Sequence, residues 1–177
     1  MTLGSGKDED KDGQQEDEPQ GRKLVMRSDL MTIGDDYWIE DDSGRKVYHV
    51  DGKAMRMRDT WVLEDANGRE MATIRERKLT LRDKFRIERD GKTLATVRRA
   101  AGWGDRFAVE VEDGKDLKAH GRLLEHEYKI ERDGQLVAKV SKKWFRIRDS
   151  YGIAIEGGED EGLILASVVA IDALGPG

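Results

Sequence analysis

The stretch from Glu159 to Leu174, EDEGLILASVVAIDAL, determines how the rest of this chain is organised. An acidic turn precedes nine residues, Leu163 to Ile171, that have no charged side chain. As a helix, this run is apolar on every face, so it needs an apolar surround on all sides. A bilayer is one such surround, but about 20 apolar residues are needed to span it. The stretch therefore predicts a helix at about 159–174 that lies inside a shell of protein.

The preceding residues repeat in a way that can build this shell. An aromatic residue followed two positions later by a branched aliphatic one recurs at intervals of 21 to 24 residues. The six pairs are Tyr37/Ile39, Trp61/Leu63, Phe85/Ile87, Phe107/Val109, Tyr128/Ile130 and Tyr151/Ile153. Because alternation with a period of two is typical of half-buried strands, each pair marks a strand whose aromatic residue should be buried.

Each of the first five pairs is followed by an acidic turn that contains glycine. The turns are DDSG (41–44), DANG (65–68), ERDG (88–91), EDG (112–114) and ERDG (131–134). Glycine allows the positive φ of a tight hairpin, and Asp or Asn caps such a turn. A second alternating run follows each turn, so the repeating unit is a hairpin.

Five hairpins, with 23–27 as a first strand and 149–156 as a last one, give twelve strands. Repeats of this length also occur in propellers and in paired sheets, but the apolar helix favours a closed antiparallel barrel. A helix of fifteen residues is about 22 Å long, which matches strands of six or seven residues. A barrel of twelve strands also leaves a lumen that something must fill.

The units LTLRDKFRIERDG (79–91) and LATV (94–97), the later DSYGI (149–153) and the ending EDEGLILASVVAIDAL resemble the LURP-one-related family. This family is part of the Tubby C-terminal-like superfamily, which includes the phospholipid scramblases. The resemblance covers roughly 22–174 and implies a mainly β fold, a twelve-stranded barrel threaded by a buried C-terminal hydrophobic helix. Family members mostly lack an established activity, whereas superfamily relatives bind phosphoinositides or have been tied to lipid movement and transcription.

The charge of the chain is concentrated at its beginning. Residues 1–21 hold seven acids and two bases and few large apolar side chains, and the whole chain has a net charge of -5. We expect a disordered acidic tail at 1–21 and a single LURP-one-related barrel domain at 22–177. Because acids and bases balance after the tail, a generally basic nucleic-acid binder is disfavoured. Without cysteine or a signal-like apolar segment, a cytoplasmic protein is expected.

Catalytic patterns are absent from the sequence. His49, His120 and His126 form no HxxxH or HExxH motif, and neither Ser141 nor Ser150 lies in GxSxG. The glycine-rich stretches also lack the spacing of a phosphate-binding loop. We therefore expect no enzyme, no catalytic residue, no cofactor and no metal.

The acidic cluster before the helix allows two interpretations. Glu156, Glu159, Asp160 and Glu161 provide oxygen ligands of the kind that Ca²⁺ prefers, and a calcium site has been proposed there in scramblase-like relatives. The spacing of an EF-hand loop is not matched, however. Acids at a helix N-terminus also interact favourably with its dipole, by about 0.3–1 kcal/mol each, and this structural interpretation is favoured.

The two ends of the expected barrel differ in charge. The hairpin turns hold 11 acids and 6 bases, whereas the connectors from 51–59 onward hold 14 bases and 7 acids. The densest basic segment is KKWFRIR (142–148), and connectors expected near it add further bases. The candidate lipid- or anion-binding residues are Lys142, Lys143, Trp144, Arg146, Arg148, Arg98, Arg99, Arg77 and Lys78. Trp144 and Phe145 are alternatively rim plugs among solvated charges.

These observations favour a non-enzymatic binding module whose basic end contacts anionic phospholipid headgroups. The expected partners are an anionic membrane surface, contacted peripherally, or a protein; nucleic acid is disfavoured and no transmembrane span is expected. A scramblase-like lipid-handling protein and a protein–protein scaffold remain the alternatives. The acidic tail is expected to compete for the basic end, since it is opposite in charge and flexibly linked.

Overall fold

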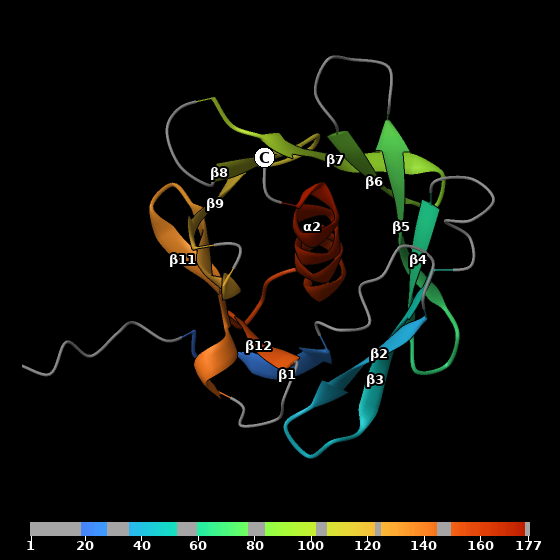
Figure 1. Cartoon of the computed structure of the whole chain (residues 1–177). Helices are drawn as coiled ribbons and strands as arrows, with labels where there is room; N and C mark the ends of the chain where they lie inside the picture. The colour runs from blue at the N-terminus through green and yellow to red at the C-terminus, as the bar shows by residue number, and fades with distance from the viewer. Residues whose placement is uncertain are drawn as a thin grey trace, which may run out of the picture.

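The computed structural model describes residues 19–27, 36–52, 60–77, 84–101, 106–122, 125–144 and 150–175. Within these ranges, twelve strands close into one antiparallel barrel around a single α-helix, α2 (Figure 1). The strands are β1 (Arg22–Arg27), β2 (Tyr37–Asp41), β3 (Lys46–Asp51), β4 (Thr60–Asp65), β5 (Glu70–Arg77), β6 (Lys84–Arg89), β7 (Lys92–Arg99), β8 (Arg106–Val111), β9 (Leu117–Arg122), β10 (Glu127–Arg132), β11 (Gln135–Ser141) and β12 (Ser150–Ile155). Neighbours in sequence are neighbours in the sheet, and β1 pairs with β12 to close it. The predicted fold class is confirmed.

The aromatic repeat places side chains inside the barrel, as the sequence predicts. The six repeat aromatics are at most 6% exposed, and their aliphatic partners two positions later are fully buried. Because side chains alternate along a strand, the remaining strand positions face outward, and most of the charged side chains of the strands lie at these positions. The alternation therefore sorts the chain into an apolar lining and a charged outer surface.

The hairpin turns follow the repeat at the backbone level. Asp90 and Gly91, like Asp133 and Gly134, both have positive φ, which is the geometry of a two-residue hairpin turn. Four hairpins also shift register just before the turn, at the step from the repeat aliphatic to a glutamate. The β8–β9 hairpin differs, because Gly114 lacks positive φ and Asp116 accepts a hydrogen bond from the Val111 N–H instead.

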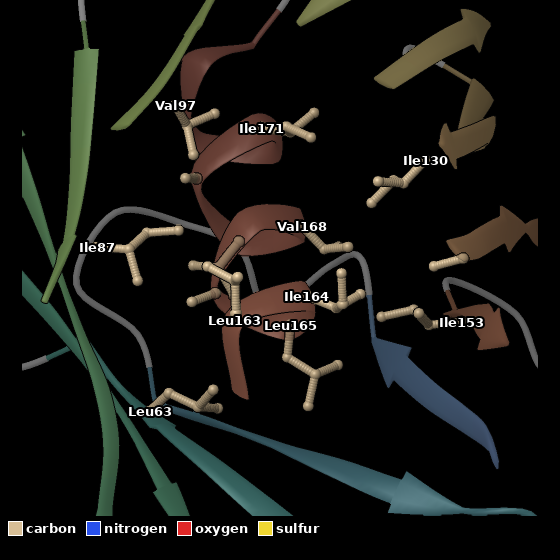
Figure 2. Packing of buried hydrophobic residues seen from close by; sticks show 14 of the residues in the cluster. Leu63, Ile87, Val97, Ile130, Ile153, Leu163, Ile164, Leu165, Val168 and Ile171 are labelled. Atoms are coloured by element: carbon tan, nitrogen blue, oxygen red, sulfur yellow. The ribbon is translucent and has the colours of Figure 1, made fainter. Parts of the chain in front are cut away.

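Helix α2 (Glu161–Leu174) occupies the lumen, and its residues from Gly162 to Ile171 are all buried. Apolar side chains from strands all round the barrel, such as Leu63, Val97 and Ile153, point toward it (Figure 2). Ser167, the polar residue in the apolar run, donates a hydrogen bond to the Leu163 carbonyl over 2.7 Å, as expected for a buried helical serine. The sequestered helix is confirmed, and it begins two residues later than the predicted start.

Among the described residues, no helix has the length and apolar character that crossing a membrane requires. Most of the acidic segment at 1–21 lies outside the described residues, as do Lys78, Phe145, Arg146 and Arg148. The boundary between a tail and a domain near residue 21 therefore stays a prediction.

Candidate functional site

The acidic cluster before α2 fastens the helix to the barrel. Asp160 is the N-cap residue: its carboxylate accepts a hydrogen bond from the Leu163 N–H at 3.0 Å. The same carboxylate receives two hydrogen bonds from the Arg89 guanidinium, at 2.8 and 2.9 Å. These contacts hold the pKa of Asp160 below its ordinary value, with the bond from Arg89 as the largest cause. Asp160 therefore has a structural role: it caps α2 and links the helix to Arg89 of β6.

The glutamates on either side of Asp160 make similar contacts. Glu159 pairs with Arg132 at 2.6 Å, and Glu161 pairs with Arg22 at 3.0 Å. Glu161 also accepts a hydrogen bond from Tyr48, whose pKa rises to about 12, chiefly through burial. Among the described residues, no group of three or more His, Asp or Glu side chains is arranged to hold a metal ion. Glu159, Asp160 and Glu161 are thus engaged in ion pairs with arginines of the barrel strands, in line with the favoured structural interpretation.

At the other end of α2, Arg99 is engaged with the helix. Its Nη2 donates hydrogen bonds to the Leu174 carbonyl, at 3.1 Å, and to the Gly175 carbonyl. The guanidinium also lies over the Phe107 ring, 5.0 Å from the centroid. A cation at the negative end of the helix dipole satisfies carbonyls that have no partner within the helix. Arg99 is therefore a helix-capping residue in this structure.

The basic residues expected to lie together fall on two sides of the barrel. Arg77 ends β5, whereas Lys142 and Lys143 follow β11, and five strands separate β5 from β11 in either direction round the ring. Figure 1 shows these two strands on opposite sides of α2. Arg77 pairs in register with Lys84, which pairs with Arg98. We call Arg77, Lys84 and Arg98 the far row.

Trp144 lies against the outside of the barrel and not in its mouth. It ends the short 3₁₀ helix η3 (Lys142–Trp144), which packs on β12. The ammonium groups of Lys23 and Lys139 lie 5.6 and 5.7 Å from its ring centroid. Both lysines are register partners of Ala154, one from each side. The indole therefore covers this alanine, whose small outward side chain leaves room for it.

The two lysines that precede Trp144 are directed toward solvent. Lys142 and Lys143 are exposed, and neither ammonium has an ion-pair partner among the described residues. The backbone N–H of Lys142 donates to the Glu127 carboxylate over 2.9 Å, and Ser141 donates to the same group. The turn is thus held by its backbone while its two charges stay available.

A second tryptophan lies on the same side of the barrel. Trp38 faces outward from β2 and is the exposed large hydrophobic residue of the described chain, at 36%. Its ring lies against the His49 ring, tilted by 37° with the centroids 4.7 Å apart, and the Lys46 ammonium lies 5.1 Å from its centroid. Strands β2, β1, β12 and β11 are consecutive in the ring, so both tryptophans belong to one surface. We call Lys23, Trp38, Lys46, Lys139, Lys142, Lys143 and Trp144 the tryptophan wall.

A buried polar group lies where α2 ends. The Asp172 carboxyl accepts a hydrogen bond from the Tyr151 hydroxyl. Burial raises the pKa of Asp172 to about 7, although that hydrogen bond and the charge of Lys142 act in the opposite direction. The hydroxyls of Tyr37 and Tyr128 are buried without a partner among the described residues, and their pKa values are raised by burial and then by the charge of Asp172.

His126 completes this buried group. Its ring stacks on Tyr151 with centroids 4.4 Å apart, and its Nε2 lies 3.7 Å from Asp172 Oδ2. That distance would permit an ion pair. Burial, and secondarily the charge of Lys142, lowers the pKa of His126 to about 4. The pKa values of the two groups therefore place the proton on the carboxyl, and the pair is neutral between about pH 4 and 7.

Sequence reasoning missed part of both arrangements. Lys23, Lys46, Lys139 and Trp38 were not among the expected binding residues, although the alternation that buries Tyr37 also directs Trp38 outward. His126, which the sequence did not single out as a buried group, is half-buried and stacks on Tyr151. Asp172 carried a signal too, because it directly follows the charge-free run of a helix that is expected to be buried, where a carboxyl is poorly solvated.

Comparisons with known proteins agree with this architecture. The model of the LURP-one-related family matches residues 22–172. An X-ray structure of a protein from Arabidopsis thaliana superimposes with a TM-score of 0.65 and 20% sequence identity, over 88% of this chain and 93% of that one. This likeness supports the fold. No curated protein matches the chain. Since the family model spans the whole barrel and nearly all of α2, the chain belongs to the LURP-one-related family.

Proposed function

We propose that this protein is a non-enzymatic binding module that attaches peripherally to anionic phospholipid headgroups through the tryptophan wall. The observation that carries the proposal is the composition of that wall. Trp38 of β2 has one lysine ammonium over its ring, and Trp144 of η3, which packs on β12, has two. Lys142 and Lys143 are exposed beside them.

The physical chemistry of a membrane surface suits this combination. Each lysine near an anionic leaflet contributes about 1 kcal/mol of attraction, and tryptophan prefers the interface between headgroups and acyl chains. The far row supports the function less well. Arg98 there is bound to Glu110 over 2.7 Å, and the described part of that row has no tryptophan.

Relative to the expected basic end, the proposed surface is displaced onto the side of the barrel. It retains Lys142, Lys143 and Trp144 and adds Lys23, Lys46, Lys139 and Trp38. Arg99 is assigned to the fold, because its guanidinium caps α2. Lys78, Arg146 and Arg148 lie outside the described residues and stay candidates from the sequence.

Sedimentation with vesicles tests the proposal. Wild-type protein is mixed with neutral phosphatidylcholine vesicles, or with vesicles that also contain phosphatidylserine, at low and at high salt. We compare the variant Lys142→Gln/Lys143→Gln with Arg77→Gln/Lys84→Gln, a matched control that removes the same charge from the far row. Two charges at about 1 kcal/mol each predict a roughly 30-fold loss of partitioning for the first variant.

The expected result is binding to anionic vesicles that weakens with salt, is lost in the wall variant and is retained in the control. Equal losses in both variants would show that overall charge, and not the wall, drives binding. If wild-type protein binds no vesicle, the proposal is wrong, and a protein partner becomes the function to pursue.

A further inference from the structure

We propose that the acidic N-terminal segment, residues 7–18, docks on the tryptophan wall of its own barrel and competes there with the anionic surface. This inference rests on the proposed function, because it names a regulator of the same surface. The occupant is a segment of this chain that lies outside the described residues. Its charge, its point of attachment and its length are the grounds for the assignment.

The attachment point lies next to the wall. The Gln20 N–H donates a hydrogen bond to Glu156 over 3.2 Å, and Arg22 pairs with Glu161 at 3.0 Å. These contacts hold the start of β1 against the barrel. Lys23, the next residue, already belongs to the wall and lies over Trp144. The acidic segment is therefore tethered at the edge of the surface that it is proposed to cover.

The charges of the segment and of the wall are complementary. Residues 7–18 hold seven acids and two lysines, and the wall holds five lysines, of which Lys23, Lys46, Lys142 and Lys143 are exposed and Lys139 is buried at 6%. The hairpin-turn end beside the tether is acidic, since the hairpin turns hold 11 acids and 6 bases. Repulsion between like charges disfavours docking of the acidic segment at that end. The lysines of the tryptophan wall, in contrast, are opposite in charge to the segment. Opposite charges within a Debye length of about 10 Å at 0.1 M salt attract each other.

Eighteen residues precede the first described position. A flexible chain of that length has a root-mean-square span of about 23 Å, and the six residues of β1 rise about 20 Å. A random chain of that length is therefore long enough to run beside β1, along the wall. The far row is on the opposite side of the ring, so reaching it requires the chain to pass round the barrel.

Tethering makes a weak contact effective. Short flexible linkers give effective concentrations in the millimolar range. A segment with a dissociation constant of about 1 mM then covers the wall for a large part of the time, and removing it strengthens vesicle binding several-fold. A contact of this strength remains easy for a highly charged membrane to displace.

The first measurement compares vesicle sedimentation of the full chain with that of a chain lacking residues 2–18. A third protein carries the full-length segment with its seven acids changed to Asn or Gln, which separates charge from bulk. The inference predicts that both altered proteins bind anionic vesicles several-fold more tightly at low salt and that the difference disappears at high salt. Unchanged binding in both would overturn it.

The second measurement needs no lipid. A synthetic peptide of residues 1–18 is titrated into the ¹⁵N-labelled truncated chain, and the indole N–H signals of Trp38 and Trp144 are followed by NMR. We expect shifts at these indoles that are lost in Lys142→Gln/Lys143→Gln and kept in Arg77→Gln/Lys84→Gln. Absence of shifts, or shifts confined to the far row, refutes the docking.

The two measurements separate this inference from the proposed function. If the peptide binds the wall but no vesicle does, the docking stands and the membrane function falls. If vesicles bind the wall equally with and without the segment, and the peptide causes no shifts, the function stands and the docking falls.

Discussion

At the scale of single residues, the buried pair of Asp172 and His126 has the most direct consequence for stability. Both groups are held away from water and both are pushed toward their neutral forms, so their pKa values move in opposite directions. Lys142 acts on both through its charge alone. Facing groups include Tyr151, Tyr128 and Tyr37 from three strands, and the nearby Arg99 is engaged with the helix carbonyls.

These shifts predict an unusual dependence of stability on pH. The pKa of Asp172 is about 7 in the folded chain against 3.8 ordinarily, so the unfolded chain loses this proton first and stability falls as pH rises from about 4 to 7. The pKa of His126 is about 4 against 6.5, so its contribution to stability is lost as pH falls over nearly the same range. The two slopes cancel between about pH 4 and 6.5.

The variant Asp172→Asn removes the pH dependence of stability that Asp172 contributes and leaves that of His126. Between pH 5 and 8, we expect its free energy of unfolding to gain about 3 kcal/mol relative to wild type, since one pKa unit is worth about 1.4 kcal/mol. Urea unfolding at a series of pH values measures this. Other carboxylates, such as Asp65 and Asp133, titrate alike in both proteins and drop out of the difference. Parallel pH profiles for the two proteins would contradict the assignment.

At the scale of elements, α2 is held at both ends as well as along its length. Its buried apolar side chains contribute about 1.5–3 kcal/mol each, but such contacts do not fix its depth in the lumen. Arg89, Arg132 and Arg22 bind the acids at its N-terminus, and Arg99 binds the carbonyls at its C-terminus. These directional contacts fix the depth of α2 within the barrel.

Two substitutions at Asp160 separate the cap of α2 from its ion pair with Arg89. Asp160→Asn keeps an acceptor for the Leu163 N–H but removes the charge, and it should cost less than about 1 kcal/mol because the pair is partly exposed. Asp160→Ala removes both and should cost about 1 kcal/mol more. Urea unfolding at pH 7 compares them; equal costs would mean that the cap contributes nothing.

At the scale of the whole molecule, closure of the ring matters more than any single hairpin. β1 is bonded to β12 on one side and to β2 on the other, so the first and last strands of the chain complete the barrel together. The same closure creates the tryptophan wall, because it brings Lys23 of β1 beside Trp144 from the far end of the sequence.

Truncation tests the role of closure. A chain that begins at residue 19 should unfold at the same urea concentration as the full chain, since it retains β1. A chain that begins at residue 28 loses β1 and should not fold cooperatively, because two strand edges and the apolar face of α2 are then exposed. Circular dichroism and urea unfolding measure both. A cooperative transition in the shorter chain would show that β1 is dispensable.

The barrel and the helix that fills it follow from patterns within the sequence. The repeat of Tyr37, Trp61 and their equivalents predicts strands, because it reflects the alternation of buried and exposed positions. The charge-free run from Leu163 to Ile171 predicts a helix that is buried on all sides. The hydrogen bond of Ser167 and the hairpin turn at Asp90 could also be predicted from the sequence, because each depends on residues close by in the chain.

Which charged side chains come into contact depends on the folded barrel. Arg77 and Lys142 both follow strands at the same end of the barrel, yet the strand order places them on opposite sides of it. Trp144 finds Lys23 across 121 positions of sequence, and Asp172 finds His126, because a closed ring brings distant segments together at particular registers. A count of charges along the chain does not say on which side of the barrel each charge lies. Binding surfaces and the pKa values of buried groups depend on that position.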